Sequence, residues 1–294
     1  MFALHDWSTV PSFVVYTSSV TNPASRSEAE LLADRIVRVV PTLPTQALRM
    51  AWLRDALTTP APSLAAAALE LVCDASDRGD PGCREVLVSL TGMLQDPASR
   101  PLLDLLRSAV SQDAVSPVAR IVHGGVSLTG GKRKTSGAAD DQHRVPDYGR
   151  GRPLTLGERK ALARRPTRKL LDRLLADPHP QVIRNLLDNS ITTEDDVVRL
   201  AARRPLPGEV MVEIARHPRW NVRTRIRMAM LLNPACPAEV GVPLVGLLSL
   251  AELRSVADMF DVQEAIHHAV MERLRRPVVV TDYELPLDDD GDLN

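Results

Sequence analysis

The stretch Ala163-Arg164-Arg165-Pro166 occurs twice in this chain. It returns thirty-nine residues later as Ala202-Arg203-Arg204-Pro205, and the apolar residues that follow it return as well. A period of about forty residues that holds two apolar stripes at helical spacing is the signature of an α-solenoid. The repetition therefore predicts an all-α fold for the second half of the chain. It also favours binding over catalysis, because a stacked helical array leaves a long face free.

Length and composition narrow the class of protein further. The chain has 294 residues, which suits one extended array or two smaller domains, and only 3% of them are aromatic. No basic start leads into an apolar run, and no apolar stretch is long enough to cross a bilayer, so we expect no membrane partner. The three cysteines (Cys73, Cys83 and Cys236) are scattered and odd in number, which indicates a reducing, cytoplasmic location.

Charge is distributed unevenly although the formal net charge is only −1. Basic residues outnumber acidic ones over 132–227, and acidic residues outnumber basic ones over 228–294. This pattern can mark a site for a polyanion, or an acidic tail that shields the basic middle until a partner displaces it. A solvated surface with local fluctuations in charge is the alternative interpretation.

Periodicity and composition divide the chain into five segments. Helical spacing between proline-containing turns predicts two helical blocks, over 25–122 and over 154–276. The glycine-rich and charged stretch 123–153 has no apolar periodicity and predicts a flexible linker. Residues 1–24 are expected to be irregular, and 277–294 to form a disordered acidic tail.

Several helix starts can be predicted from local signals. Ser27-x-x-Glu30 is a capping box, and Pro62 and Pro81 each stand at the first position of an expected helix. The acidic run Glu194-Asp195-Asp196 follows Thr193, as expected for a helix N-terminus that favours negative charge.

The second half resembles two related families, the leucine-rich repeat variant and the HEAT-like repeats, over roughly residues 160–245. The family pattern runs from Ala-x-x-Pro through a leucine helix and Ala-x-Asp-Pro to Val-Arg and Asn-Pro. In the first copy the matching residues are Ala163, Pro166, Leu170, Leu174, Ala176, Asp177, Pro178, Val182, Arg184 and Asn189. In the second copy they are Ala202, Pro205, Val210, Ile214, Ala215, Pro218, Val222, Arg223, Asn233 and Pro234. The segment from Pro237 to Leu253 looks like a third, degenerate unit.

The resemblance carries expectations for individual residues. It implies that Val182 and Val222 point inward and that Arg184 and Arg223 each bond to a neighbouring turn. Asp177 is expected to cap the turn that it precedes. Some leucine-rich variant proteins hold an iron–sulfur cluster on cysteines, but this chain has no cysteine cluster, so no cofactor is predicted.

Residues for catalysis or metal binding do not stand out. The seven histidines show no metal-ligand spacing, and no nucleophile can be tied to a base. His179 and His217 fall in equivalent turns of the two copies, beside Pro180 and Pro218, and are expected to be structural. We therefore predict no catalytic residues and no metal site.

The basic residues are the strongest candidates for function. Arg164-Arg165 and Arg203-Arg204 hold equivalent positions and are predicted to stack as an arginine ladder on one edge of the array. Further cations follow at helical spacing near Trp220. The predicted contact surface consists of Arg164, Arg165, Arg203, Arg204, Arg216, Arg219 and Trp220.

This surface predicts a non-enzymatic scaffold or adaptor that binds a protein partner, for which an acidic protein is the candidate that the charge suggests. A nucleic-acid-binding module that uses the same arginines remains the alternative, and the chain's own acidic tail is a third possible occupant. The HEAT-like resemblance also admits a DNA glycosylase, which would need an acid facing Trp220. The nearby acids are Asp188, Glu209 and Glu213.

Overall fold

The computed structural model describes residues 27–111, 116–123 and 145–275. Within these ranges the chain forms fifteen α-helices and two short 3-10 helices, with no strand. The all-α class predicted from the sequence is thus confirmed. The predicted irregular segment 1–24 and acidic tail 277–294 lie outside the described residues, as does most of the predicted linker 123–153.

The first six helices form a compact unit, here called the N-terminal bundle. Its helix α3 packs against α1, α4, α5 and α6, while α2 packs against α4. The predicted helix starts are confirmed, because a capping box joins Ser27 to Glu30, and α3 and α4 begin at Pro62 and Pro81. The helices are α1 (Glu28–Val39), α2 (Gln46–Thr58), α3 (Pro62–Asp77), α4 (Pro81–Leu94), α5 (Arg100–Ala109) and α6 (Pro117–His123).

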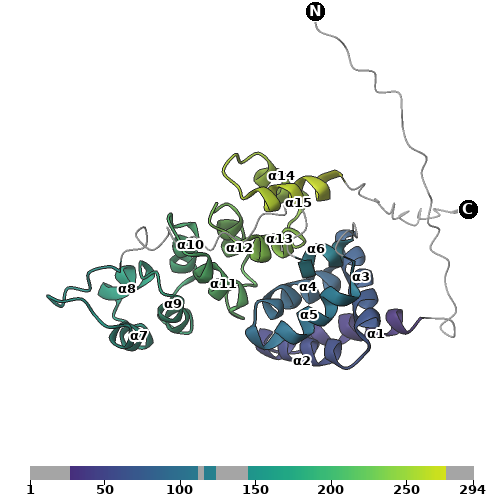
Figure 1. Ribbon diagram of the computed structural model, residues 1–294, viewed down its shortest axis with the longest axis horizontal. Helices are drawn as coiled ribbons and strands as arrows, with labels where there is room; N and C mark the ends of the chain where they lie inside the picture. The colour runs from purple at the N-terminus through teal and green to yellow at the C-terminus, as the bar shows by residue number, and fades with distance from the viewer. Residues whose placement is uncertain (1–26, 112–115, 124–144, 276–294) are drawn as a thin grey trace, which may run out of the picture.

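The remaining nine described helices are mostly short, and we call them the C-terminal array. Figure 1 shows them running from α7 and α8 at the far end of the molecule, through α10 and α12, to α13 beside the N-terminal bundle. They are α7 (Leu156–Arg164), α8 (Arg168–Leu175), α9 (Pro180–Leu187), α10 (Glu194–Ala202), α11 (Gly208–Arg216), α12 (Thr224–Leu231), α13 (Ala238–Val245), α14 (Leu250–Ala257) and α15 (Glu264–Arg275).

The two sequence copies correspond to successive groups of three helices. The first copy covers α7 to α9 and the second covers α10 to α12. In both groups the first helix packs against the third, and α13 packs against α15 in the same way. Helix α11 then packs against α9, which joins the second group to the first.

An asparagine closes each copy with the same pair of hydrogen bonds. Asn189 donates from Nδ2 to the carbonyl of Arg164 at 2.8 Å, and its Oδ1 accepts from the backbone N–H of Ile191 at 3.0 Å. Asn233 donates to the carbonyl of Arg203 at 2.8 Å and accepts from the N–H of Ala235 at 3.0 Å. The equivalent asparagines therefore tie the end of the third helix to the end of the first helix in each group.

The N-terminal bundle packs on the middle of the array. Helix α4 contacts α11 and α13, and α6 contacts α13. The contact with the second copy is close: a Cβ added at Gly92 would lie 2.0 Å from Nδ2 of Asn221, so any larger residue would force the Asn221 side chain to move. An ion pair of 3.2 Å between Arg273 and Asp77 adds a link from α15 to α3.

Asp177 lies at the centre of a buried polar cluster at the start of α9. It caps its turn as predicted, accepting from the N–H of His179 at 2.9 Å. It also accepts from the buried Arg159 at 2.6 Å and from the hydroxyl of Tyr148. Tyr148 falls in the stretch that the sequence assigns to the linker, yet it is buried, so this part of the chain belongs to the packed structure.

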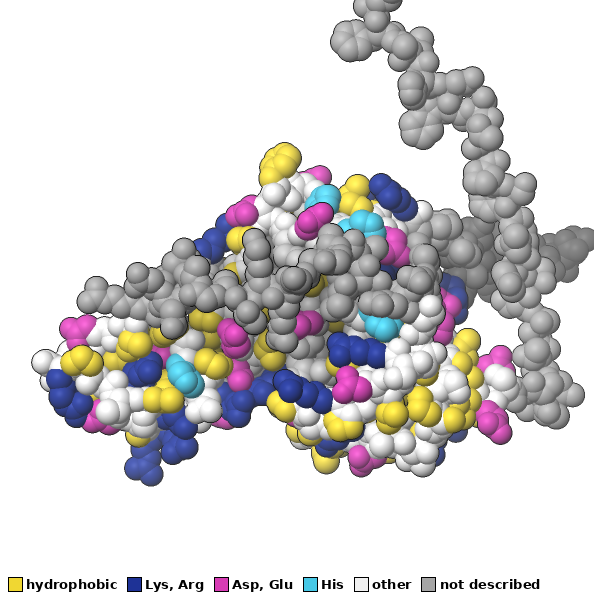
Figure 2. All heavy atoms as spheres, in the orientation of Figure 1, with side chains coloured by type: hydrophobic (Ala, Val, Ile, Leu, Met, Phe, Trp, Pro, Cys, Tyr) yellow, Lys and Arg dark blue, Asp and Glu magenta, His cyan; other side chains and the backbone are white. Residues whose placement is uncertain are grey.

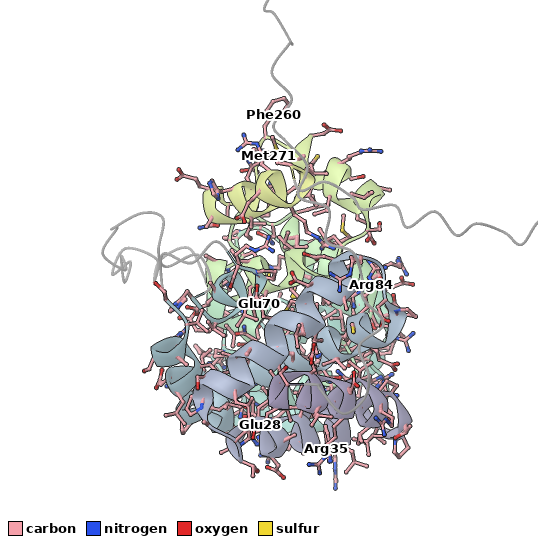
Figure 3. All side chains as sticks on the ribbon, turned by 90° about the vertical axis from the view of Figure 1, so that its right-hand side faces the viewer. Glu28, Arg35, Glu70, Arg84, Phe260 and Met271 are labelled. Atoms are coloured by element: carbon pink, nitrogen blue, oxygen red, sulfur yellow. The ribbon has the colours of Figure 1, made fainter. Side chains whose placement is uncertain are left out.

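No helix in the described ranges is both long and apolar enough to cross a bilayer. The most exposed large apolar side chain among the described residues is Phe260, in the turn between α14 and α15. Figure 3 shows Phe260 at one extreme of the molecule, opposite Glu28 of α1.

Candidate protein-interaction surface

The arginine pair of the second copy is occupied by contacts within the protein. The guanidinium of Arg203 donates to the carbonyl of Leu175 at 3.3 Å, which links the end of α10 to the end of α8. Arg204 forms an ion pair with Asp261 in the turn before α15 and donates to the carbonyl of Leu232 at 2.8 Å. This pair therefore joins the second copy to both of its neighbours.

The arginine pair of the first copy stands at the open end of the array. Arg164 and Arg165 are exposed, and no hydrogen bond or ion pair of either side chain is found within the described part of the chain. On the adjacent helix α8, Lys169 and Arg173 are also exposed and have no ion pair with a described residue. We call these four residues the basic end patch. Figure 2 shows dark-blue side chains projecting at this end of the molecule, where Figure 1 places α7 and α8.

Trp220 does not belong to an exposed surface, and its predicted role in partner contact is wrong. Only 2% of the residue is exposed, and its indole N–H donates to the carbonyl of Leu187 at 3.0 Å. Arg219 covers the ring, with its guanidinium carbon 4.3 Å from the ring centroid. Burial satisfies both the apolar ring and its single donor, which is the usual arrangement for a core tryptophan.

Arg216 also turns inward, where it forms an ion pair with Glu213. The predicted helical spacing from Arg216 onward does not hold, because α11 ends at Arg216 and α12 begins only at Thr224. The intervening residues form a turn. The predicted arginine ladder is therefore not a continuous row of free cations: its second half is used to hold the fold together.

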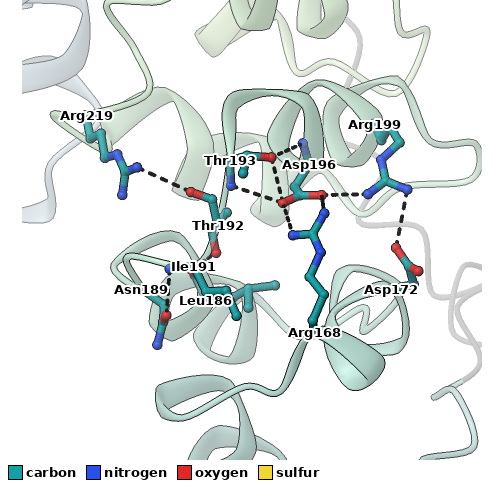
Figure 4. A network of polar contacts seen from close by, with 10 residues as sticks. All are labelled: Arg168, Asp172, Leu186, Asn189, Ile191, Thr192, Thr193, Asp196, Arg199 and Arg219. Atoms are coloured by element: carbon teal, nitrogen blue, oxygen red, sulfur yellow. Dashed lines mark hydrogen bonds and ion pairs between the residues drawn. The ribbon is translucent and has the colours of Figure 1, made fainter.

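Arg168 shows that a cation of the first copy can also be used to hold the fold together. Its guanidinium donates to the buried Asp196 at 3.0 Å, and Arg199 donates to the other carboxylate oxygen at 2.6 Å (Figure 4). Asp196 completes a capping box with Thr193 at the start of α10, as its acidic run predicted. Burial alone would raise the pKa of Asp196, but the bonds from Thr193, Arg199 and Arg168 outweigh it and lower the pKa to about 2.

The two arginines singled out by the family resemblance both reach a neighbouring helix. Arg184 forms an ion pair of 2.9 Å with the buried Glu213, and Arg223 lies 3.9 Å from the carboxylate of Glu194. Burial raises the pKa of Glu213, while Arg184 opposes that shift. Val182 is fully buried as expected, whereas Val222 is 37% exposed, contrary to expectation. The residue before it, Asn221, reaches α4 of the bundle, where its Nδ2 donates to the carbonyl of Val88 at 3.5 Å.

The acids considered for glycosylase chemistry do not form an active site around Trp220. Glu213 is engaged by Arg184 and Arg216, Asp188 contacts His217 at 3.0 Å, and Glu209 is exposed. Since the indole ring is buried under Arg219, no base could stack on it in this arrangement.

The two equivalent histidines make the same backbone contact. Nδ1 of His179 accepts from the N–H two residues later at 3.2 Å, and Nδ1 of His217 does the same at 3.2 Å. Each imidazole thus caps a turn, so both have a structural role. Within the described ranges no group of three His, Cys, Asp or Glu side chains is arranged to hold a metal ion.

Comparisons with protein-family models, with curated proteins and with solved structures found no match. The function must therefore be argued from the geometry of the surface itself. Sequence analysis identified Arg164 and Arg165 by their repetition, but it missed Lys169 and Arg173. The sequence did contain a sign of these two residues, because both follow Arg164-Arg165-Pro166 closely in a stretch that is rich in cations.

Proposed function

We propose that this protein is a non-enzymatic scaffold whose basic end patch binds an acidic segment of a partner protein. In this proposal the C-terminal array is a short α-solenoid of the HEAT-like or leucine-rich variant type. The observation that carries the proposal is the contrast between the two arginine pairs. Arg203 and Arg204 are bonded to neighbouring helices, whereas Arg164 and Arg165 are exposed without described partners.

Charge favours an acidic partner for this patch. The four residues of the basic end patch lie within ten residues of one another on two consecutive helices. The only acidic residue in the stretch 164–173 is Asp172. Asp172 is itself 3.3 Å from Arg199. Guanidinium groups bind carboxylates bidentately, and a cluster of them attracts a negatively charged segment over roughly a Debye length of about 8 Å at physiological salt.

A nucleic-acid partner is less favoured by the same observations. A duplex presents phosphates along an extended path, and a protein that follows it needs cations spread over that path. Here the cations of the second copy are used internally, so the free cations gather at one end. The experiment below treats nucleic acid as the competing outcome.

The test is an affinity purification from native lysate with and without nuclease, using full-length protein. The variant Arg164→Glu/Arg165→Glu removes half of the basic end patch. The matched control is Arg78→Glu/Arg100→Glu, which makes the same change in charge at two exposed arginines of the N-terminal bundle. A retained protein would then be titrated, in purified form, against wild type and both variants.

The scaffold proposal predicts an acidic protein that survives nuclease and binds at least about tenfold more weakly to the patch variant than to the control. A tenfold change corresponds to the loss of one charge-assisted contact. Recovery of nucleic acid, with every protein lost after nuclease treatment, would replace this proposal by the nucleic-acid-binding alternative. Equal binding by patch and control variants would overturn the assignment of the patch.

A further inference from the structure

A cleft of about 790 Å³ lies between the N-terminal bundle and the C-terminal array, and no residue of the basic end patch lines it. It is lined by residues from the first turns of four helices. Gln46 begins α2, Pro81 begins α4, Thr224 begins α12, and Ser249 is the residue before α14. Two of these helices belong to the bundle and two to the array, so neither unit could form the cleft alone.

The four helix starts along the cleft each contribute positive potential at their N-terminal ends. The N-terminus of each helix carries roughly half an elementary positive charge, together with backbone N–H groups that lack helical acceptors. Three of the four starts have a side-chain cap, from Thr45, Asp80 and Ser249. The start of α12 has none, since its preceding residue, Arg223, makes no capping bond.

Three arginines add to this potential from the cleft walls. Arg49 is paired with Glu85. Arg84 makes one long hydrogen bond, 3.5 Å to the carbonyl of Leu247, and forms no ion pair with a described residue. In Figure 3, Arg84 lies at the height where the N-terminal bundle meets helices of the C-terminal array.

Arg227 is the least expected of the three, because it is only 7% exposed and also has no described ion pair. Its two terminal nitrogens donate to the carbonyl of Asn221 at 3.0 Å and to the hydroxyl of Thr224 at 2.9 Å, while its Nε is buried without an acceptor. Burial lowers the pKa of Arg227, Glu252 opposes that shift, and Arg84 reinforces it. A buried cation without a paired carboxylate is costly, and an anion in the cleft would offset that cost.

The acids on the cleft walls are already engaged. Glu85 is paired with Arg49, and Glu252 accepts from the N–H of Ser249 at 2.7 Å in the capping box of α14. The apolar part of the wall includes prolines 44, 81 and 218 and the exposed Val222. Val222 is the position whose counterpart in the first copy, Val182, is fully buried, so the second copy presents an apolar side chain to the cleft instead of to the core.

We propose that this cleft binds a small molecule that carries a phosphate group. The phosphate would lie against Arg84 and Arg227 at the uncapped start of α12, and the rest of the molecule would contact Val222 and the prolines. Two guanidinium groups match the double charge of a phosphate monoester better than the single charge of a carboxylate. The volume lies in the range of about 300–1,000 Å³ that is usual for small-molecule sites.

Such a ligand would have a structural consequence. Because the bundle supplies Arg84 and the array supplies Arg227, a bound phosphate would join the two units across their junction. Binding should therefore raise the midpoint of thermal unfolding, as any ligand of the folded state does.

The test uses calorimetric titration and thermal unfolding of the full chain with two probes, inorganic phosphate and ATP. The first asks whether the phosphate group suffices, and the second whether an attached organic group adds affinity. The variants are Arg84→Gln, which removes the charge at a half-buried position, and Arg84→Lys, which keeps it. The control is Arg78→Gln, at the C-terminal end of α3 and outside the cleft lining.

We expect saturable binding of at least one probe to wild type, weakened about tenfold to a hundredfold by Arg84→Gln. Arg84→Lys should retain part of the affinity, and Arg78→Gln all of it. Binding of phosphate alone would identify a free-anion site, and binding of ATP alone a site for organic phosphates. Absence of binding by both probes at millimolar concentration would overturn the proposal, as would equal affinity for wild type and Arg84→Gln. Circular dichroism of each variant checks that it is folded.

Discussion

The group α7–α9 and the group α10–α12 begin with the same four residues, yet they use them differently. In the second group the guanidinium of Arg203 bonds to the carbonyl of Leu175 in the first group, and that of Arg204 pairs with Asp261 in the turn before α15. In the first group the side chains of Arg164 and Arg165 are exposed and form no hydrogen bond or ion pair with described residues. The difference is one of position among the described helices: the second group contacts α9 before it and α13 after it, whereas the contact of the first group with another group is that of α9 with α11.

The same comparison holds for other equivalent positions. Asp177 is a buried acid that binds Arg159, whereas its counterpart Arg216 is a cation that binds Glu213. Val182 is in the core, and Val222 faces the cleft beside the bundle. A repeated motif therefore fixes the local backbone, while the neighbouring helices decide what each side chain does.

The largest expected effect distinguishes Asp177 from Arg216. Asp177→Ala should lower the free energy of unfolding by about 3–5 kcal/mol, because it leaves the buried Arg159 without a carboxylate. Arg216→Ala should cost only about 1 kcal/mol, since Glu213 keeps its ion pair with Arg184. Urea unfolding of both variants measures the difference, and equal losses would show that the two copies are energetically alike.

The two valines should differ in the same direction. Val182→Ala removes fully buried methyl groups and should cost about 2–3 kcal/mol. Val222→Ala, at a position that is 37% exposed, should cost less than about 1 kcal/mol. Chemical unfolding again provides the measurement. A loss at Val222 as large as that at Val182 would mean that this turn is packed as tightly as the core.

Lowering the pH should affect the capping boxes at the starts of α7 and α10 unequally. The pKa of Asp196 is lowered from 3.8 to about 2, so its ionised form stabilises the fold above pH 4, and that contribution is lost as the pH falls toward 2. Asp196→Asn should therefore be less stable than wild type by about 2 kcal/mol at pH 5, with the gap closing near pH 2.

The equivalent residue of the first copy, Glu158, also has its pKa lowered to about 2, chiefly by its bond from Arg152. Its side chain is 39% exposed, so water and salt screen that interaction, and Glu158→Gln should leave the pH dependence of unfolding nearly unchanged. Unfolding midpoints measured from pH 5 to pH 2 for both variants test this contrast. A constant gap between wild type and Asp196→Asn would contradict it.

The smallest expected effect concerns the arginines themselves. Arg204→Ala should lower the free energy of unfolding by about 0.5–1 kcal/mol, because it removes an exposed ion pair with Asp261 and a bond to Leu232. Arg165→Ala should change stability by less than about 0.5 kcal/mol. Thermal unfolding of the Arg204→Ala and Arg165→Ala variants measures both changes. A measurable loss of stability at Arg165 would show that the basic end patch contributes to the stability of the fold.

Local signals in the sequence determined the helices and much of their placement. The capping box at Ser27 and Glu30, the prolines at 62 and 81, and the acids after Thr193 satisfy or avoid unpaired N–H groups within a single turn. Such interactions need no distant partner, so they can be read from neighbouring residues. The repeated Ala-Arg-Arg-Pro stretch likewise marked two equivalent helix ends.

Only the tertiary structure decided which of these residues remain available. Trp220 is buried because α9 supplies the carbonyl of Leu187 for its indole, and Arg204 is engaged because the turn before α15 brings Asp261 to it. The cleft at Arg84 and Arg227 exists because α4 packs on the array, between residues more than one hundred positions apart. The spacing of residues in the sequence predicts the local geometry of the backbone. The exposure and ion pairing of a side chain depend on helices that come into contact only when the chain folds.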